Sequence, residues 1–324
     1  MSDKITVHIK EFRQALMGLG ILSVLAVHLY YMGYFPDVVS LFLKDSTMFV
    51  YVEGFLFLSG FGLYYSCSSN TLFQYYKKRV KRLLLPYVIL MSPYIIITSF
   101  LDGESLWLII ARIFGVSFWI EGNYASMWYV HVLLLLYAIY PLFHKAFFND
   151  TQHFASKFIL LCVVYGCLLY GVSLYFPLFF SNCSFALYRI PFFFFGACVA
   201  YSFIRHDNSL WLVLWLVSYI VISISNCSEN LESVRHIYFA VYLLPLLALA
   251  VGALHQIRHY AVLKLLFVLN WFGRYTLEIY ILHLLIMLIV FRLGYDMRIS
   301  IITGELLAVS LCSFVHVGLK SIIK

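Results

Sequence analysis

The chain has 324 residues, of which 63% are hydrophobic and only 11% are charged, and its formal net charge is +7. Soluble domains carry about 25% charged residues, so this composition excludes an ordinary soluble protein. The positive charge is divided between loops on two membrane faces and therefore does not indicate binding to nucleic acid. We predict one all-α domain over residues 1–324, a polytopic transmembrane helical bundle.

Apolar windows of about 20 residues, long enough to cross a bilayer, predict ten spans. They lie at 15–34, 47–66, 83–101, 127–143, 157–178, 186–204, 209–226, 237–255, 276–293 and 300–319. The segment 105–119 is also apolar, but it is short and contains Arg112. We expect it to lie in the outer membrane interface or to dip into it. The basic and aromatic connection 256–275 is expected at the inner interface.

The distribution of lysine and arginine predicts that both termini are cytoplasmic. With the N-terminus inside, the inner segments hold 16 of the 22 basic residues and the outer segments hold 6. Acidic residues favour the outer side, among them Asp102, Glu104 and Glu121. This bias follows the positive-inside rule. Counting 105–119 as an eleventh span reverses every later loop and removes the bias.

The seven cysteines cannot form a fully paired disulfide framework. Five of them lie in or beside apolar runs, where cysteine behaves as a small hydrophobic residue. Only Cys183 and Cys227 fall in predicted outer loops, and a bridge between these two stays open. No cysteine or histidine cluster has the spacing of zinc ligands, so we expect no metal.

Two ionisable residues lie inside consecutive spans. His28 is six residues from the outer end of the first span, and Glu53 is six residues from the outer end of the second. At 1.5 Å per residue both lie about 9 Å below the outer surface, and consecutive helices are commonly neighbours. A carboxylate hydrogen-bonded to one ring nitrogen raises the basicity of the other, which predicts a general base. The alternative is a polar pair that only holds two helices together.

A dense basic stretch follows the second span. Residues 77–82 carry five positive charges, and such a stretch on the inner face is a strong topology signal. Arg79 and Arg82 are also spaced i, i+3, so they share one face of a helix. Two guanidinium groups on one face fit the phosphates of a nucleotide-bearing donor. Both interpretations stay open from the residues alone.

Further aromatic and polar residues lie near the ends of later spans. Trp128 and Tyr129 begin the fourth span, where aromatic residues are commonly interface anchors. His131 follows them and is expected to be a packed histidine. Glu278 lies near the inner face, where it caps a helix or reaches the interface. His283 lies about 10 Å deep and either lines a cavity or packs in the core.

These segments, in this order, resemble the membrane acyltransferase family 3, whose members O-acylate sugars of envelope glycans. The resemblance covers nearly the whole chain. It rests on the first span with His28, on Glu53 followed by Phe57-Leu58-Ser59-Gly60-Phe61, on Arg79-x-x-Arg82 with Pro86, on Trp128-Tyr129-Val130, and on the segment from Gly273 to His283.

The resemblance implies transfer of an acyl group, most often acetyl, from cytoplasmic acyl-CoA to a hydroxyl of an extracytoplasmic or lipid-linked glycan. It implies that Arg79 and Arg82 hold the CoA phosphates and that His28, with Glu53, is the general base on the acceptor hydroxyl. Whether transfer is direct or passes through an acyl-enzyme stays open. Ser59 is better explained by close packing beside Gly60.

One position departs from the commonest family pattern, which has an arginine eleven residues before the histidine. This chain has Met17 there, and Arg13 lies one turn earlier on the same face. Arg13 is therefore the candidate for that charge at the donor. We expect no appended extracytoplasmic domain, as in the stand-alone form of the family. The resemblance also implies a bacterial cytoplasmic membrane.

Two rival functions also account for buried ionisable residues and ten spans. The first is a transporter or flippase for a glycan or small molecule, although the chain has no detectable inverted repeats and no paired glycine- or proline-broken helices. The second is a non-catalytic membrane subunit of a glycan-synthesis complex. An assay of acyl-CoA-dependent O-acylation with the purified protein separates all three.

Overall fold

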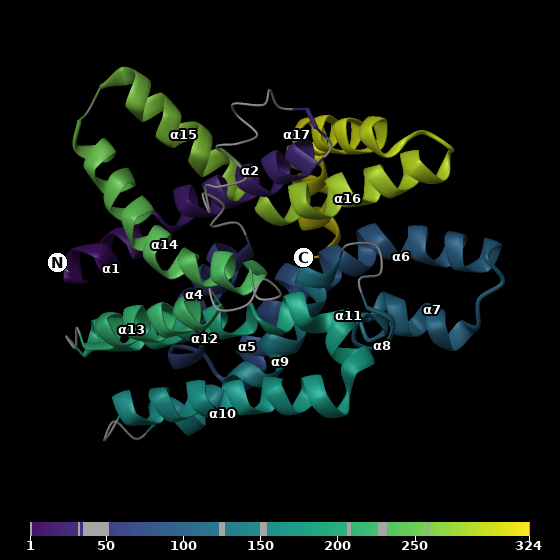
Figure 1. Ribbon diagram of the computed structural model, residues 1–324. Helices are drawn as coiled ribbons and strands as arrows, with labels where there is room; N and C mark the ends of the chain where they lie inside the picture. Colours follow the sequence, from purple (N-terminus) through teal and green to yellow (C-terminus); the bar gives the residue numbers. More distant parts are fainter. Residues whose placement is uncertain are drawn as a thin grey trace. The chain divides into compact units, whose positions relative to one another are not determined.

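The computed structural model describes residues 2–31, 33–34, 52–122, 127–149, 154–205, 209–225, 232–257 and 259–323. Within these ranges the chain is almost entirely helical and contains no strand, as predicted (Figure 1). Its contacts divide it into two compact units that alternate along the sequence. Unit 1 comprises 1–69, 144–164 and 188–274, and unit 2 comprises 70–143, 165–187 and 275–324. The single domain over 1–324 stays a prediction.

Unit 1 is built around a helix that is buried on all sides. Its helices are α1 (Ser2–Glu11), α2 (Arg13–Tyr31), α4 (Val52–Ser68), α12 (Ile190–Ile204), α13 (Ser209–Ser225), α14 (Glu232–Gln256) and α15 (Tyr260–Arg274), with parts of two helices shared with unit 2. Every residue of α4 from Val52 to Phe61 is buried. A helix that is apolar around its whole circumference belongs in a core, and α4 occupies that place here.

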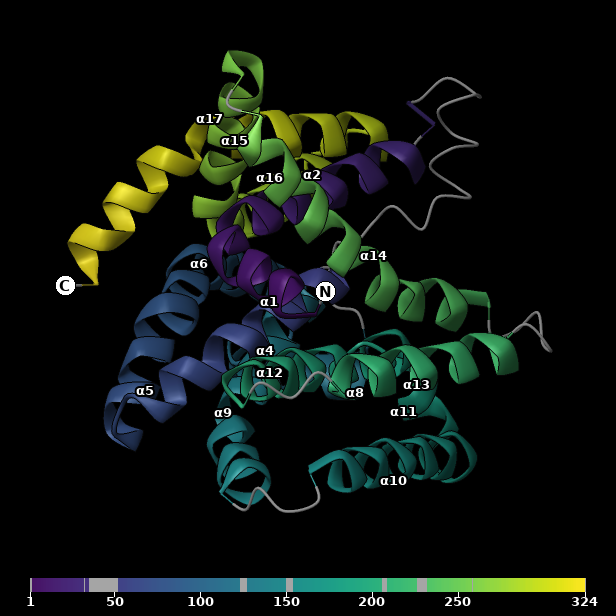
Figure 2. The ribbon, with the colours of Figure 1, turned by 90° about the vertical axis from the view of Figure 1, so that its left-hand side faces the viewer.

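Helices α4 and α12 lie side by side in contact (Figure 2). A Cβ on Gly60 would lie 1.7 Å from the carbonyl oxygen of Phe193, and one on Gly196 would lie 1.9 Å from that of Phe57. Only glycine lets two helix backbones approach this closely, and small residues are the usual contact between helices in membranes. The close packing predicted beside Gly60 is confirmed, with α12 as the neighbour.

The connection 256–275, expected as an interfacial segment, contains the helix α15, which packs against α2. A Cβ on Gly18 would lie 1.9 Å from the carbonyl oxygen of Leu269, and one on Gly273 would lie 1.8 Å from that of Gln14. The two glycines bring the backbones of α2 and α15 together. The sequence pattern of basic and aromatic residues concealed this contact, because the contact is made by the glycines.

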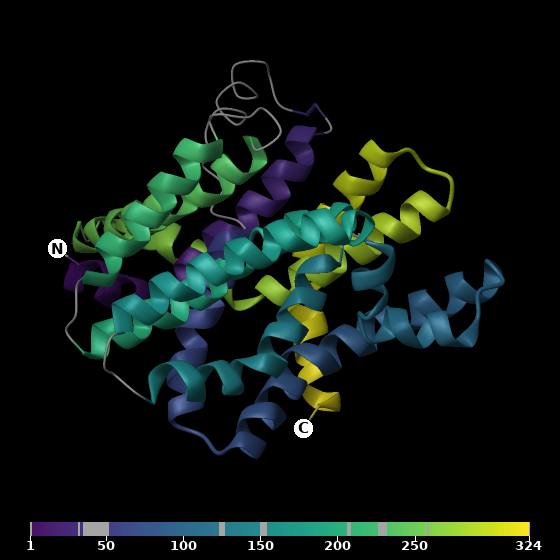
Figure 3. The same ribbon diagram turned by 60° about the horizontal axis from the view of Figure 1, so that its bottom comes forward.

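Unit 2 holds the basic stretch and the C-terminal hairpin. Its helices are α5 (Leu72–Arg79), η1 (Val80–Leu84), α6 (Leu85–Leu101), α7 (Leu106–Ile113), α8 (Ser117–Glu121), α11 (Pro177–Leu187), α16 (Thr276–Arg292) and α17 (Met297–Ile322), with most of α9 (Trp128–Phe148) and the second half of α10 (Phe154–Tyr175). Helices α16 and α17 form a closely packed hairpin, yellow in Figure 3. A Cβ on Gly304 would lie 2.5 Å from the carbonyl oxygen of His283, so the two helices meet without a side chain between them.

The predicted interfacial segment 105–119 consists of the short helices α7 and α8, separated by Gly115 with φ of 72°. Helix α7 packs against α6. Arg112 is buried, forms an ion pair with Glu104, and has its Nε 3.5 Å from a carboxylate oxygen of Glu121. Neither α7 nor α8 is long enough to span a bilayer. This agrees with the exclusion of an eleventh span.

The basic stretch enters α6 through one turn of π-helix, η1, in which the N–H of Leu85 donates to the carbonyl oxygen of Val80. Pro86 explains this turn. It has no N–H to donate to the carbonyl of Arg82, and its ring clashes with that carbonyl in an α-helix. The wider i→i+5 turn relieves the clash.

Six helical segments of the described chain are long and apolar enough to cross a membrane, or seven if the bent pair α15–α16 counts as one. Large hydrophobic side chains are widely exposed on these helices, and the segment Phe154–Tyr175 is only 6% buried. This surface requires a lipid environment, so the protein is an integral membrane protein. Within the described residues, each of the ten predicted spans overlaps a helix. Their number and the side of the termini stay predictions.

The possible disulfide rests on a residue outside the described part of the chain. Cys183 is a buried free thiol, 3.6 Å from the carbonyl oxygen of Phe118. Cys227 lies in the range 226–231, which the structure does not describe, so the bridge stays open.

Candidate functional site

The carboxylate of Glu53 is held by an arginine from a distant part of the sequence. Nε of Arg189 donates to Oε1 of Glu53 at 2.6 Å, and the two side chains are only 15% and 4% exposed. Oε2 is buried and has no hydrogen-bond partner among the described residues. Glu53 is the second residue of α4, and Arg189 immediately precedes α12. The result is a buried ion pair with one carboxylate oxygen left open.

His28 lies in the last turn of α2, which packs against α4 as expected. Its side chain is half-buried. The hydrogen bond predicted between His28 and Glu53 is not made, since Oε1 of Glu53 binds Arg189 and Oε2 has no partner in the described chain. Helix α12 packs closely against α4, and Arg189, which immediately precedes α12, occupies the carboxylate oxygen that was expected to bind His28. Adjacent helices therefore did not imply paired side chains.

Arg13 lies at the opposite end of α2 from His28, about 22 Å away along the helix axis. Its Nε donates to the carbonyl oxygen of Leu58 at 3.0 Å. A Cβ on Gly62 would lie 2.9 Å from Cζ of Arg13, so the guanidinium occupies the space that the missing side chain leaves. Arg13 thus connects α2 to the middle of α4, at a place distinct from Glu53.

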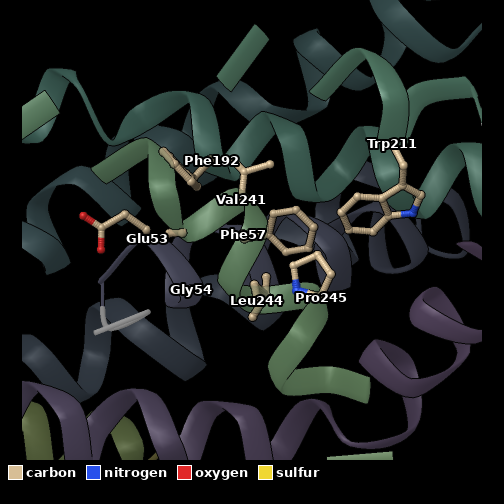
Figure 4. A pocket seen from close by; sticks show the side chains of 9 residues that line it. Glu53, Gly54, Phe57, Phe192, Trp211, Val241, Leu244 and Pro245 are labelled. Atoms are coloured by element: carbon tan, nitrogen blue, oxygen red, sulfur yellow. The ribbon is translucent and has the colours of Figure 1, made fainter. Parts of the chain in front are cut away.

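A small apolar pocket lies beside Glu53 between α4, α12, α13 and α14. Phe57, Phe192 and Trp211 form much of its wall. In Figure 4 the carboxylate of Glu53 points away from the ring of Phe57. The pocket therefore offers an apolar surface and no polar group except Glu53 at its edge.

Arg79 and Arg82 lie on either side of the junction between α5 and η1. The guanidinium of Arg79 lies over the rings of Tyr75 and Tyr137, with centroids at 5.6 and 5.7 Å, and Arg82 is exposed. The hydroxyl of Tyr75 donates to the carbonyl oxygen of Tyr137 at 3.0 Å, which fixes α5 on α9. Because η1 is a π turn, the i, i+3 spacing does not place the two arginines on one face as it would in an α-helix.

The aromatic residues that begin α9 have different neighbours. Trp128 packs edge-to-face on Phe185, with ring centroids 4.7 Å apart. Tyr129 contacts Tyr280 at 5.4 Å, and Tyr280 in turn contacts His283 at 5.5 Å. The structure therefore groups Tyr129 with His283, both of them candidates from the sequence, and places Trp128 in a separate aromatic contact.

Two other predicted histidines are buried. Nδ1 of His283 lies 2.9 Å from the carbonyl oxygen of Ile279, one turn earlier, to which it donates. Nε2 of His131 lies 2.8 Å from the hydroxyl oxygen of Tyr87, whose proton is directed to the carbonyl oxygen of Arg112 at 3.2 Å. His131 is packed between aromatic rings, in agreement with the expectation for this residue.

Glu278 is paired with a histidine from the last helix. Its Oε1 lies 2.5 Å from Nδ1 of His316, and the two side chains are 9% and 20% exposed. Nε2 of His316 is buried and without a hydrogen-bond partner among the described residues. The ring of Tyr275 packs edge-to-face on His316 at 5.2 Å. The carboxylate–imidazole arrangement expected for Glu53 and His28 is thus found at Glu278 and His316.

Sequence reasoning missed both partner residues, Arg189 and His316. A signal existed for each. Arg189 is three residues from the outer end of the sixth predicted span, and Glu53 is six residues from the outer end of the second. His316 is three residues from the inner end of the tenth predicted span, and Glu278 is two residues from the inner end of the ninth. The depth comparison that paired His28 with Glu53 therefore also pairs His316 with Glu278.

The fold and these sites define an all-α integral membrane protein with charged pairs buried inside its helical units. No group of three or more potential metal ligands occurs in the described ranges. Residues 15–318 match the family model described as an acyltransferase domain, that of acyltransferase family 3. The chain therefore belongs to this family of membrane acyltransferases. No curated protein and no solved structure matches it.

Proposed function

We propose that the protein transfers an acyl group, acetyl in the simplest case, from cytoplasmic acyl-CoA to a hydroxyl of an extracytoplasmic or lipid-linked glycan in the cell envelope. The observation that carries this proposal is the family match, which extends over residues 15–318 and thus over nearly all candidate spans. The membrane we propose is the bacterial cytoplasmic membrane, where acyl-CoA is available on one face.

His28 is the general base in this proposal. It removes the proton from the acceptor hydroxyl as the oxygen attacks the acyl carbonyl, a contribution of about 10²–10⁴ to the rate. Glu53 supplies negative charge in the same unit, on the neighbouring helix α4. Arg189 fixes one oxygen of Glu53 and leaves Oε2 open. In this proposal Glu53 therefore assists His28 through its charge, without the direct hydrogen bond expected from the sequence.

Arg79 and Arg82 hold the phosphates of the donor. A guanidinium forms charge-assisted, bidentate hydrogen bonds with phosphate. The exposed Arg82 is open to solvent, and Arg79 is preorganised by the rings beneath it. Arg13 is a further basic group for the donor, and its bond to Leu58 fixes its guanidinium. Trp128, Tyr129, Glu278 and His283 are candidates for lining the site.

The test is an assay of acetyl transfer from labelled acetyl-CoA to membrane glycans by the purified protein, compared with His28→Ala. We expect transfer by the wild type and none by the variant, with unchanged expression, thermal stability and acetyl-CoA binding. As a matched control, His144→Ala removes a histidine bonded to Ser68 at 3.0 Å and is expected to retain transfer. A well-folded His28→Ala protein with full activity would exclude the proposed base. Glycan movement without acylation would favour a transporter.

A further inference from the structure

The second carboxylate oxygen of Glu53 is an unfilled acceptor position inside unit 1. Oε1 accepts the hydrogen bond of Arg189 at 2.6 Å, and an ionised carboxylate has no hydrogen of its own to donate. Oε2 is buried and has no hydrogen-bond partner among the described residues, and the side chain is only 4% exposed. A buried charged group with an oxygen left unbonded is unfavourable. Oε2 therefore indicates a ligand that donates a hydrogen.

The faces of α4 explain why this ligand is not His28. Glu53 is seven residues before Gly60, so both lie on the face of α4 that meets α12. Phe55 is about 200° further around the helix. It lies on the face towards α2, where a Cβ on Gly20 would lie 2.9 Å from its ring. The start of α4 therefore separates the carboxylate of Glu53 from His28 on α2.

The apolar pocket beside Glu53 does not supply the hydrogen either. Among the side chains that line it, only Trp211 carries an N–H, and that group donates to the hydroxyl of Thr6 at 3.4 Å. In Figure 4 the carboxylate of Glu53 points away from the ring of Phe57, which lies one turn further into α4. The ligand of Oε2 therefore approaches from the start of α4, the predicted outer end of this span.

We propose that Oε2 of Glu53 binds a second hydroxyl of the acceptor sugar, on the same ring as the hydroxyl that is acylated. This inference rests on the proposed function, in which His28 removes the proton from the acylated hydroxyl. The acceptor class is thus a sugar with at least two free hydroxyls on one ring. Arg189 is a positioning residue, since it acts through Glu53.

One sugar ring reaches both groups within unit 1. His28 lies in the last turn of α2 and Glu53 in the first turn of α4, and these two helices are in contact. The axes of packed helices lie about 8–10 Å apart, and a hydrogen bond spans about 3 Å. A single hydroxyl does not bridge such a gap, whereas two hydroxyls on one ring do. The carboxylate thus acts on the acceptor without contacting His28.

The experiment separates binding of the acceptor from catalysis. Every protein compared carries His28→Ala, so that Glu53 no longer acts through the base and only its direct contact with the acceptor remains. The probe is the tritiated membrane glycan fraction that the wild type acetylates, and its Kd is measured at equilibrium together with the thermal unfolding midpoint. Glu53→Leu with Arg189→Met removes the open oxygen and both charges at similar volume.

For this double substitution we expect the Kd of the glycan to rise about tenfold to a hundredfold, the loss of one charge-assisted hydrogen bond. Glu53→Gln leaves a neutral group at Oε2 and should raise the Kd less. It is measured below its unfolding midpoint and decides alone if the double variant does not fold. Arg189→Lys keeps a positive charge at Glu53 and should keep the affinity, whereas Arg189→Met should not.

The matched control is Glu104→Gln with Arg112→Met, which removes a buried ion pair of unit 2 and should leave the Kd unchanged. Unchanged affinity in both Glu53 variants overturns the proposal and leaves Oε2 to a bound water. An equal rise in the control also overturns it, because the loss of any buried pair then suffices. A wild type that acetylates no glycan overturns the proposed function itself.

Discussion

The guanidinium of Arg189 and the carboxylate of Glu53 are 136 residues apart in sequence, yet Nε and Oε1 are 2.6 Å apart. Further along the same two helices Gly60 lies opposite Gly196, and the ring of Tyr64 contacts that of Tyr201 at 6.0 Å. The pairs occur in the same order along both helices, so α4 and α12 are parallel. The second and sixth spans of the ten-span order also run in the same direction.

Substitution of Glu53 should cost stability as well as activity. Glu53→Gln removes the carboxylate from a buried ion pair, and breaking such a pair costs about 3–5 kcal/mol. The double variant Glu53→Gln with Arg189→Met removes both charges and should recover most of this loss, without recovering acyl transfer. Thermal unfolding and turnover on the same preparations check both statements. A Glu53→Gln protein that unfolds like the wild type contradicts the ion pair.

Substitution in the basic stretch separates donor binding from topology. Arg82→Ala should weaken acyl-CoA binding about tenfold to a hundredfold, the value of a charge-assisted hydrogen bond of about 1.5–3 kcal/mol. Lys77→Ala removes the same charge from an exposed position and should leave affinity nearly unchanged. Equilibrium binding of labelled acyl-CoA measures both. If Arg79→Ala with Arg82→Ala binds donor normally, the stretch is a topology signal only.

The ion pair of Glu104 with Arg112 makes stability depend on pH. The hydrogen bond from Arg112 is the largest cause that holds the pKa of Glu104 below its usual value of 4.5. Its stabilising effect is therefore present above pH 4.5 and is lost as the pH falls through the lower, folded-state pKa. Glu104→Gln should lower the unfolding midpoint at neutral pH, and the difference from wild type should vanish in acid. A difference that persists at every pH contradicts this assignment.

The topology is open to a direct test. Ten spans with a cytoplasmic N-terminus place Asn70 and Lys324 on the inner side, in agreement with the 16-to-6 distribution of basic residues. Reporter fusions after each residue should both indicate the cytoplasm. An external position for Asn70 places Arg79 and Arg82 away from acyl-CoA and excludes their proposed role.

The helices could be predicted because apolar runs of this length have few other structures available in a membrane. Glu53 could be singled out because it lies inside such an apolar run, where a carboxylate without a partner is costly. Its partner could not be predicted from neighbouring spans. The approach of α12 depends on single glycines, Gly60 and Gly196, which carry no periodic pattern. The sequence therefore identified Glu53 as a functional candidate. Its contact with Arg189 could be found only from the packing of α12 against α4.

The C-terminal pair shows a different limitation. The sequence predicted a capping or interfacial role for Glu278, which lies near a helix end, and it did not single out His316 within the apolar span 300–319. The hairpin of α16 and α17 brings the two together, because antiparallel neighbours place their inner ends at one level. A comparison of depth across every pair of adjacent spans would have found it. Helix α15 was missed because charge and aromatic content are shared by interfacial segments and packed helices.

The π turn before Pro86 determines the rotational phase of the basic stretch. A π turn holds one residue more than an α turn, so it accommodates the extra residue without rotating the helix before it. Winding the same residues as an α-helix would rotate everything before the turn by about 100°. That rotation moves the hydroxyls of Tyr75 and Tyr76 away from the carbonyls on α9 that they bind at 3.0 and 2.8 Å. The π turn therefore keeps Tyr75 and Tyr76 in register with α9, which the charges of the stretch alone do not require.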